Sequence, residues 1–141
     1  MKTLGYLLVF AVGLGIGIGA ICVYRGISAS IHAEHVLQAA YLSIQLLEEH
    51  VRQNHGEWPN SWADLERLPA RDWSMYSWPH DSARVQQFVR VNFAIDPDRL
   101  ARQSIDEFDA VRPIGPYYPF HDTGRVAALI RAIGETRRTG D

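Results

Sequence analysis

Histidine is the residue type in this chain best suited to hold a metal ion, and the chain has six of them. His32 and His35 are three residues apart, a spacing that on a helix would turn both imidazoles toward one metal ion. His50 and His55 are five residues apart and would fall on different helix faces. No third ligand stands at a matching spacing, so the sequence predicts solvated histidines and no metal site.

Catalytic motifs are the next candidates for chemistry. No serine lies in the G-x-S-x-G setting of a nucleophile elbow. The carboxylate pairs Asp96/Asp98 and Asp106/Asp109 fall in predicted turns and helix caps, where acidic side chains serve structure. We therefore predict no catalytic residue, no cofactor and no enzymatic activity.

The tryptophans form the most concentrated group of distinctive side chains. All four lie between residues 58 and 78: Trp58, Trp62, Trp73 and Trp78. Exposed indoles could stack on a sugar or hold a peptide, since tryptophan is enriched in binding hot spots. Buried indoles would instead build the core of a small domain, which is the interpretation that the sequence favours. The four tryptophans remain a candidate surface for a ligand or partner.

The elements that must position these residues begin with an apolar N-terminal segment. Residues 4–24 carry no charged side chain, and a helix of that length matches the hydrocarbon thickness of a bilayer. Tyr6 and Tyr24 stand near its ends, where aromatic rings favour the membrane interface. The alternative is a cleaved signal peptide with a cleavage site at residues 28–30, although such apolar regions are usually shorter. We predict a retained transmembrane helix over residues 4–24 after a short head, residues 1–3.

Charge sets the predicted orientation. Lys2 and the N-terminal amine favour the cytoplasmic side, and Arg25 is the only Lys or Arg close to the other end of the span. Because the head holds no domain, we expect a single-pass protein of the bacterial cytoplasmic membrane with its soluble part outside the cytoplasm. The formal net charge of −2 gives no electrostatic reason to expect nucleic acid.

Glycines within the predicted span favour a helical partner. Gly13, Gly15, Gly17 and Gly19 make two overlapping G-x-x-x-G pairs, a spacing that lets two helix backbones approach closely. The alternative is the general abundance of glycine in membrane helices. The predicted partners are therefore the lipid bilayer and another transmembrane helix or a second copy of this chain.

A helix and a small soluble α+β domain are predicted over residues 27–135. Apolar residues recur at steps of three and four from Leu37 to Val51, which is typical of one helix face. Leu42 and Leu46 lie off that stripe. We therefore expect the helix to pack on its own domain along one side and on an unknown protein partner along the other.

Strand and helix signals follow along the rest of the chain. Val85 to Ile95 alternates as a strand does, and a second strand is predicted over residues 110–114. Gly56 is expected to end the first helix, and Ser104 and Glu107 have the spacing of a helix-capping box. Asp122 is expected to cap a last helix that Gly134 ends, and residues 136–141 are expected to form a polar tail.

This order of elements resembles the type IV pilins and pseudopilins. The segment AYLSIQLLEEHVRQNHGEWPNSWADL, residues 40–65, looks like the end of the long pseudopilin helix, with its glycine stop and the short Ser-capped helix that follows. Gly5-Tyr6 is similar to the leader cleavage pair, and Phe10 stands where the family has a glutamate. The resemblance covers the first half of the chain. It implies an α+β fold in which a transmembrane helix continues into a long amphipathic helix, packed on a small antiparallel sheet with a C-terminal helix.

The predicted function is accordingly that of a membrane-anchored, non-enzymatic structural or interaction protein of pilin-like plan. The alternative is a membrane-tethered module that binds a sugar or peptide through its Trp-rich loop.

Overall fold

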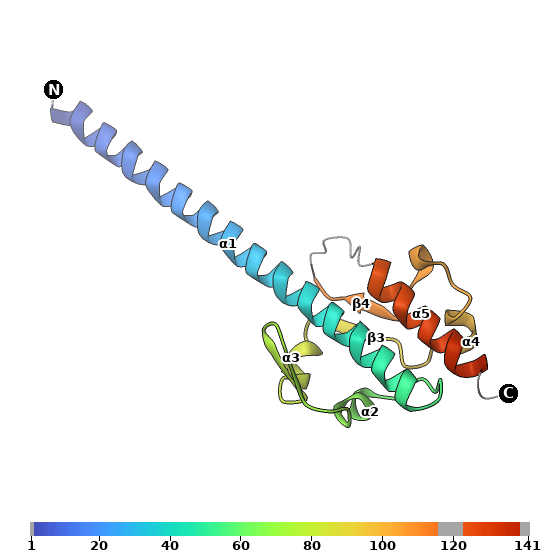
Figure 1. Ribbon diagram of the computed structural model, residues 1–141. Coiled ribbons are helices and arrows are strands. Elements are labelled where there is room, and N and C mark those ends of the chain that lie inside the picture. The colour runs from blue at the N-terminus through green and yellow to red at the C-terminus, as the bar shows by residue number, and fades with distance from the viewer. Residues whose placement is uncertain (1, 116–122, 139–141) are drawn as a thin grey trace. The chain divides into compact units, whose positions relative to one another are not determined.

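The computed structural model describes residues 2–115 and 123–138, with side chains from residue 20 to 115 and from 123 to 136. The chain divides into two units, Met1–Glu34 and His35–Asp141, and each is described by itself. The elements, labelled in Figure 1 where there is room, are α1 (Lys2–Gln53), α2 (Trp62–Glu66), β1 (Arg71–Trp73), β2 (Tyr76–Trp78), α3 (Ser82–Val85), β3 (Val89–Val91), α4 (Pro97–Leu100), η1 (Ile105–Glu107), β4 (Val111–Pro113) and α5 (Thr123–Arg138).

The described residues of the first unit all belong to α1. The helix begins at Lys2, so most of the predicted head is already helical. The predicted packing glycines, Gly13, Gly15, Gly17 and Gly19, precede residue 20 and lie outside the part whose side chains are described. In the part of the chain that is described, no helix has a stretch long and apolar enough to cross a membrane.

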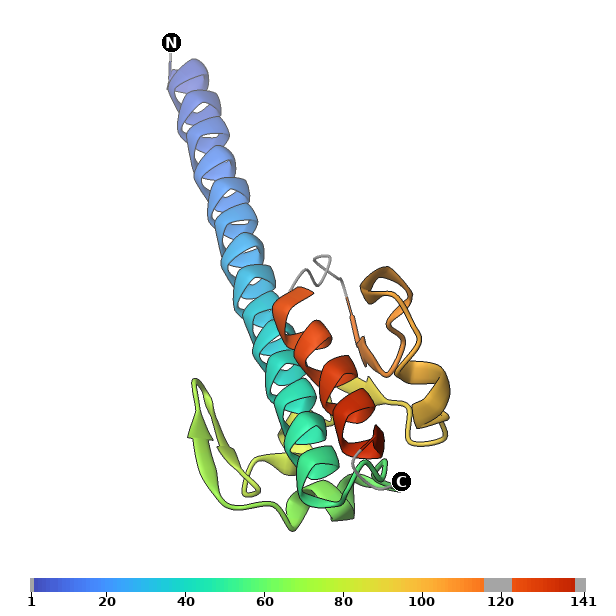
Figure 2. The same cartoon turned by 45° about the vertical axis from the view of Figure 1, so that its right-hand side comes forward.

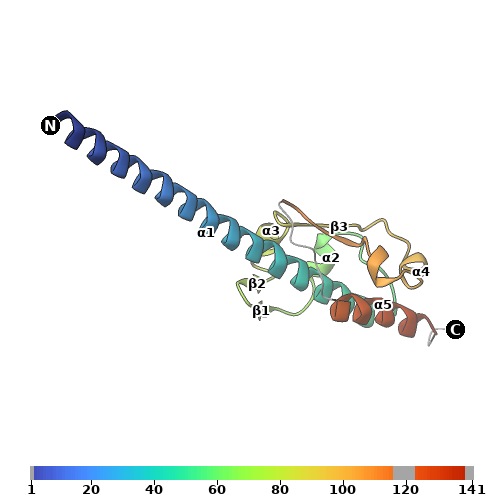
Figure 3. The same ribbon diagram turned by 90° about the horizontal axis from the view of Figure 1, so that it is seen from above.

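The C-terminal part of α1 is the central helix of the second unit. Its fully buried side chains belong to Ala39, Ala40, Leu42, Ile44, Leu46, Leu47 and Val51. Figures 1 and 2 show α5 alongside this part of α1. Figures 1 and 3 place the β1–β2 hairpin and β3 on different sides of α1. Burial of this helix against several elements makes it the scaffold of the domain.

The second apolar side of α1 is covered by the domain itself. Leu42 and Leu46, which lie off the predicted stripe, are 0% exposed, whereas Leu37 on the stripe is half-buried. The domain's own core therefore covers Leu42 and Leu46, and the unknown protein partner stays a prediction. The buried face of α1 is wider than a single stripe since elements pack on it from more than one direction.

The end of α1 agrees with the sequence. The helix ends at Gln53, and Gly56 has a φ of 90°, a conformation that favours glycine. The Gly56 amide donates to the Val51 carbonyl at 2.9 Å, which satisfies one of the last helix carbonyls. The predicted helix stop at Gly56 is confirmed.

The predicted α+β class is also confirmed, but the strands form two separate antiparallel sheets. β1 pairs with β2 and β3 with β4, and each sheet has two strands. The predicted strand from Val85 to Ile95 contains only β3, because Ser82–Val85 forms the helical turn α3. In that turn the Val85 amide donates to the Asp81 carbonyl at 2.9 Å. The strand assignment was wrong at Val85 because a helical turn can bury this side chain just as a strand can.

The helix caps of the C-terminal half were partly predictable. Ser104 and Glu107 form the expected capping box of η1. The side chain of Asp96 accepts the Asp98 amide at 2.9 Å and caps α4. Helix α5 passes through Gly134 and reaches Arg138, beyond the predicted end, while Asp122 lies outside the described residues.

Candidate interaction site

Two of the four candidate tryptophans belong to the core, which is the interpretation that the sequence favours. Trp58 is 8% exposed, and its indole N–H donates to the Asn92 carbonyl at 3.0 Å. Trp78 is 2% exposed, and its indole N–H donates to the Leu65 carbonyl at 3.1 Å. Each indole N–H thereby finds a backbone acceptor although its ring is buried. These two rings are therefore structural and not available to a ligand.

The other two tryptophans are half-buried and pack on the core. Trp62 meets Phe93 edge to face, with ring centroids 5.8 Å apart. The guanidinium of Arg125 lies 4.9 Å from the Trp73 ring centroid and 5.1 Å from that of Tyr41. Arg125 thus joins α5 to β1 and α1 by cation–π contacts. The structure does not bring the four tryptophans together on one exposed surface.

His35 is held in an aromatic cluster of the second unit. Its Nδ1 lies 3.3 Å from the Tyr76 hydroxyl, which also donates to the His35 carbonyl at 3.1 Å. The imidazole stacks on Phe88 with ring centroids 5.3 Å apart. Burial raises the pKa of Tyr76 to about 12, so the hydroxyl stays protonated and able to donate even above its usual pKa of 10. This arrangement positions β2 and the residue that precedes β3 against α1.

The predicted histidine pair is divided between the units, since His32 belongs to the first and His35 to the second. Across the described side chains, no three His, Cys, Asp or Glu residues come together to hold a metal ion.

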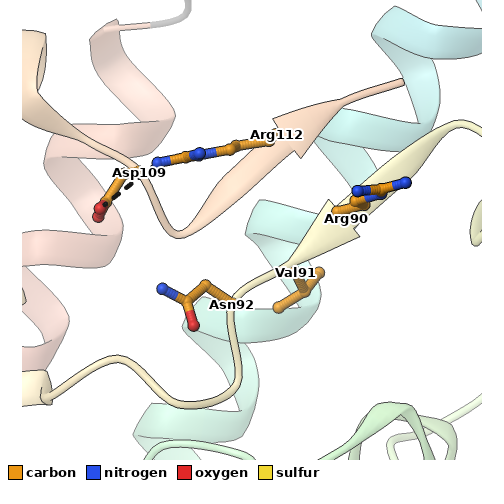
Figure 4. Close-up of a pocket in the computed structure, with 5 residues that line it drawn as sticks. All are labelled: Arg90, Val91, Asn92, Asp109 and Arg112. Carbon is orange, nitrogen blue, oxygen red and sulfur yellow. Dashed lines mark ion pairs between the residues drawn. The ribbon is translucent and has the colours of Figure 1, made fainter. Parts of the chain in front are cut away.

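A surface that sequence reasoning missed lies on the β3–β4 ribbon. Arg90 and Arg112 are paired directly opposite each other, and both side chains are exposed. They line a hollow of about 210 Å³ together with Val91, Asn92 and Asp109. Figure 4 shows Arg112 turned toward Asp109 while the Arg90 guanidinium points the other way. Like charges placed opposite each other on a ribbon repel, which fits the divergence of the two side chains.

Asp109 is the shared carboxylate of this surface. Its Oδ2 lies 3.3 Å from Arg99 and 3.9 Å from Arg112, and its Oδ1 accepts from Gln103 at 3.4 Å. One negative charge is therefore divided between two guanidinium groups. Among the described residues Arg90 has no ion-pair partner, so the cationic charge of the ribbon is only partly compensated.

A second hollow, of about 410 Å³, adjoins through Arg99 and Gln103. Its lining also includes Arg102 and Glu107, and the Glu107 carboxylate is engaged in the capping box with Ser104. We define the arginine surface as the exposed side chains of Arg90, Arg99, Arg102 and Arg112. Its four guanidinium groups face two carboxylates in a chain whose formal net charge is −2. The surface is locally cationic and can hold anionic groups.

A third hollow, of about 260 Å³, lies over α1 and β1. Its charges are already matched, because Arg52 pairs with Glu48 at 3.0 Å and Arg71 pairs with Glu49. Side chains that are already paired with opposite charges bind an additional charged group only weakly. The arginine surface is therefore the better candidate for recognition.

Comparison of the chain with models of known families, with characterised proteins and with solved structures found no match. Helix α1 is the scaffold of the second unit, and the arginine surface can hold anionic groups.

Proposed function

We propose that this chain is a single-pass, membrane-anchored structural or interaction protein of pilin-like plan, without enzymatic activity. In this proposal residues 4–24 lie in the cytoplasmic membrane of a bacterium, and the α+β domain lies outside the cytoplasm. The partners are the bilayer and a second transmembrane helix, which a copy of the same chain could supply.

One observation carries the proposal: the uncharged run of residues 4–24 and the buried core face from Val36 to Val51 belong to the same helix, α1. A helix satisfies its own backbone hydrogen bonds, which lipid requires. Because the proposed anchor and the core of the domain share one helix, the anchor can be removed only by cleaving the chain within α1. In the pilin-like plan, one helix both spans the membrane and packs in the core of the domain.

The alternative of a tethered sugar- or peptide-binding module depends on exposed tryptophans. Trp58 and Trp78 are buried, and Trp62 and Trp73 pack on the core from separate places. The described residues thus offer little support for a Trp-lined ligand surface.

Membrane retention tests the proposal directly. Leu14→Arg places a charge at the centre of the uncharged run, where arginine costs about 2.5–3.5 kcal/mol in insertion. We expect the full-length variant to move from the carbonate-resistant membrane fraction into the soluble fraction. The matched control is Ile105→Arg, because Ile105 is an exposed apolar residue of the domain.

The control is expected to remain in the membrane fraction with the unaltered protein. An unaltered chain that is fully extracted by carbonate, or a Leu14→Arg variant that is retained as firmly as the control, would contradict the anchor.

A further inference from the structure

Two directly opposed arginines on the β3–β4 ribbon do not favour folding. Each strand has three residues, and the ladder continues through the Asn92 amide to Ala110 at 2.8 Å and the Ile114 amide to Phe88 at 2.7 Å. On so short a ribbon a directly opposed pair of like charges weakens the pairing. A neutral or oppositely charged pair would stabilise it better, so the position of Arg90 and Arg112 calls for an explanation outside the fold.

We propose that the arginine surface is the docking site for an acidic peptide segment of a partner protein. Guanidinium groups bind carboxylates through two parallel hydrogen bonds, which gives this pairing both direction and strength. Carboxylates bound at the diverging guanidinium groups of Arg90 and Arg112 would neutralise the charge that the ribbon leaves uncompensated. A further carboxylate, a few residues along the same segment, would meet Arg102, which has no ion pair among the described residues.

The half-buried carboxylate of Asp109 favours one class of anionic partner over the others. It lines the hollow of Arg90 and Arg112, and it binds both Arg112 and Arg99, which lines the other hollow. A continuous layer of lipid phosphates would be repelled by this fixed negative charge. A nucleic acid backbone needs several phosphates neutralised along a track, and two carboxylates interrupt the four guanidinium groups here. Separate carboxylates on a peptide can bind on either side of Asp109, and a peptide is therefore the partner that fits.

The test uses the full-length protein in a neutral detergent and a fluorescein-labelled hexaglutamate peptide, with binding followed by fluorescence anisotropy. The variant Arg90→Gln/Arg112→Gln removes the opposed pair, and we expect its dissociation constant to rise about tenfold, as the loss of two exposed ion pairs implies. The matched control is Arg67→Gln/Arg131→Gln, since both residues are exposed and neither lines the surface. The control lowers the net charge equally and is expected to leave the dissociation constant unchanged.

Competition identifies the class of partner. Unlabelled hexaglutamate is expected to displace the probe better than an equally charged oligothymidylate or vesicles of phosphatidylglycerol. Absence of hexaglutamate binding, an equal loss in the control double variant, or stronger competition by the oligonucleotide or the vesicles would each overturn the proposal.

Thermal unfolding separates recognition from a structural role. Because the opposed arginines weaken the ribbon, Arg90→Gln/Arg112→Gln is expected to unfold at the same or a higher temperature than the unaltered protein. A lower unfolding temperature would show that the arginines serve the fold. The inference rests on the proposed interaction role but not on the anchor, so peptide binding and membrane retention can fail independently.

Discussion

The width of the buried face of α1 can be tested with two leucines of the same helix. Leu46 is fully buried although it lies off the predicted apolar stripe, and Leu37 is half-buried although it lies on it. We predict that Leu46→Ala destabilises the domain much more than Leu37→Ala. Sequence periodicity alone would place the larger effect at Leu37.

The magnitude follows from burial. Truncating a fully buried leucine removes its transfer free energy and leaves a cavity, at a cost of about 2–5 kcal/mol. For a domain of this size a loss of about 3 kcal/mol lowers the unfolding temperature by about 10–20 °C. Leu37 keeps part of its side chain in solvent, so its truncation is expected to cost about 1 kcal/mol, toward the centre of the range for single substitutions.

The assay is thermal or urea unfolding followed by tryptophan fluorescence, because Trp58 and Trp78 are buried and report on the second unit. Helical circular dichroism would also report on the first unit and is the weaker probe. Equal unfolding temperatures for the two variants, or a greater loss in Leu37→Ala, would refute the argument that the domain's own core covers the second side of α1.

Two further predictions concern proton binding and helix packing. Burial lowers the pKa of His50 below its usual 6.5, so the unfolded chain binds more protons just below that pH. The free energy of unfolding should therefore rise with pH through this range, and His50→Gln should flatten that slope in urea titrations between about pH 5 and 7; an unchanged slope would contradict the assignment. Cys22 is exposed and lies on the helix face of Gly15, so oxidation in membranes should crosslink two copies that pack through this face. Gly15→Leu should abolish the crosslink and Gly13→Leu should preserve it, as judged by non-reducing electrophoresis; the opposite result would move packing to the other glycine pair.

Local signals in the sequence predicted local structure. The stop of α1 at Gly56 and the capping box of Ser104 and Glu107 depend on residues close together in the chain, and both are confirmed. The strand predicted from Val85 to Ile95 was too long, because alternating valines also suit a helical turn followed by a short strand. The periodicity of apolar residues cannot distinguish a strand from a helical turn followed by a short strand when both structures bury the same side chains.

The interaction surfaces depended on contacts between distant residues. Arg90 and Arg112 become neighbours only through the register of β3 with β4, and Asp109 is shared only because α4 returns to the ribbon. The alternation of β3 does indicate that Arg90 faces outward, but it carries no information on the residue opposite. For the same reason the sequence could not show which tryptophans would be buried.

The proposal to test first is that residues 4–24 remain in the protein and hold it in lipid. The most direct measurement is the intact mass of the native polypeptide recovered from isolated membranes after carbonate washing. The account predicts that the membrane pellet contains a chain that still includes the whole uncharged run. A freely soluble polypeptide that begins near residue 31 would contradict it.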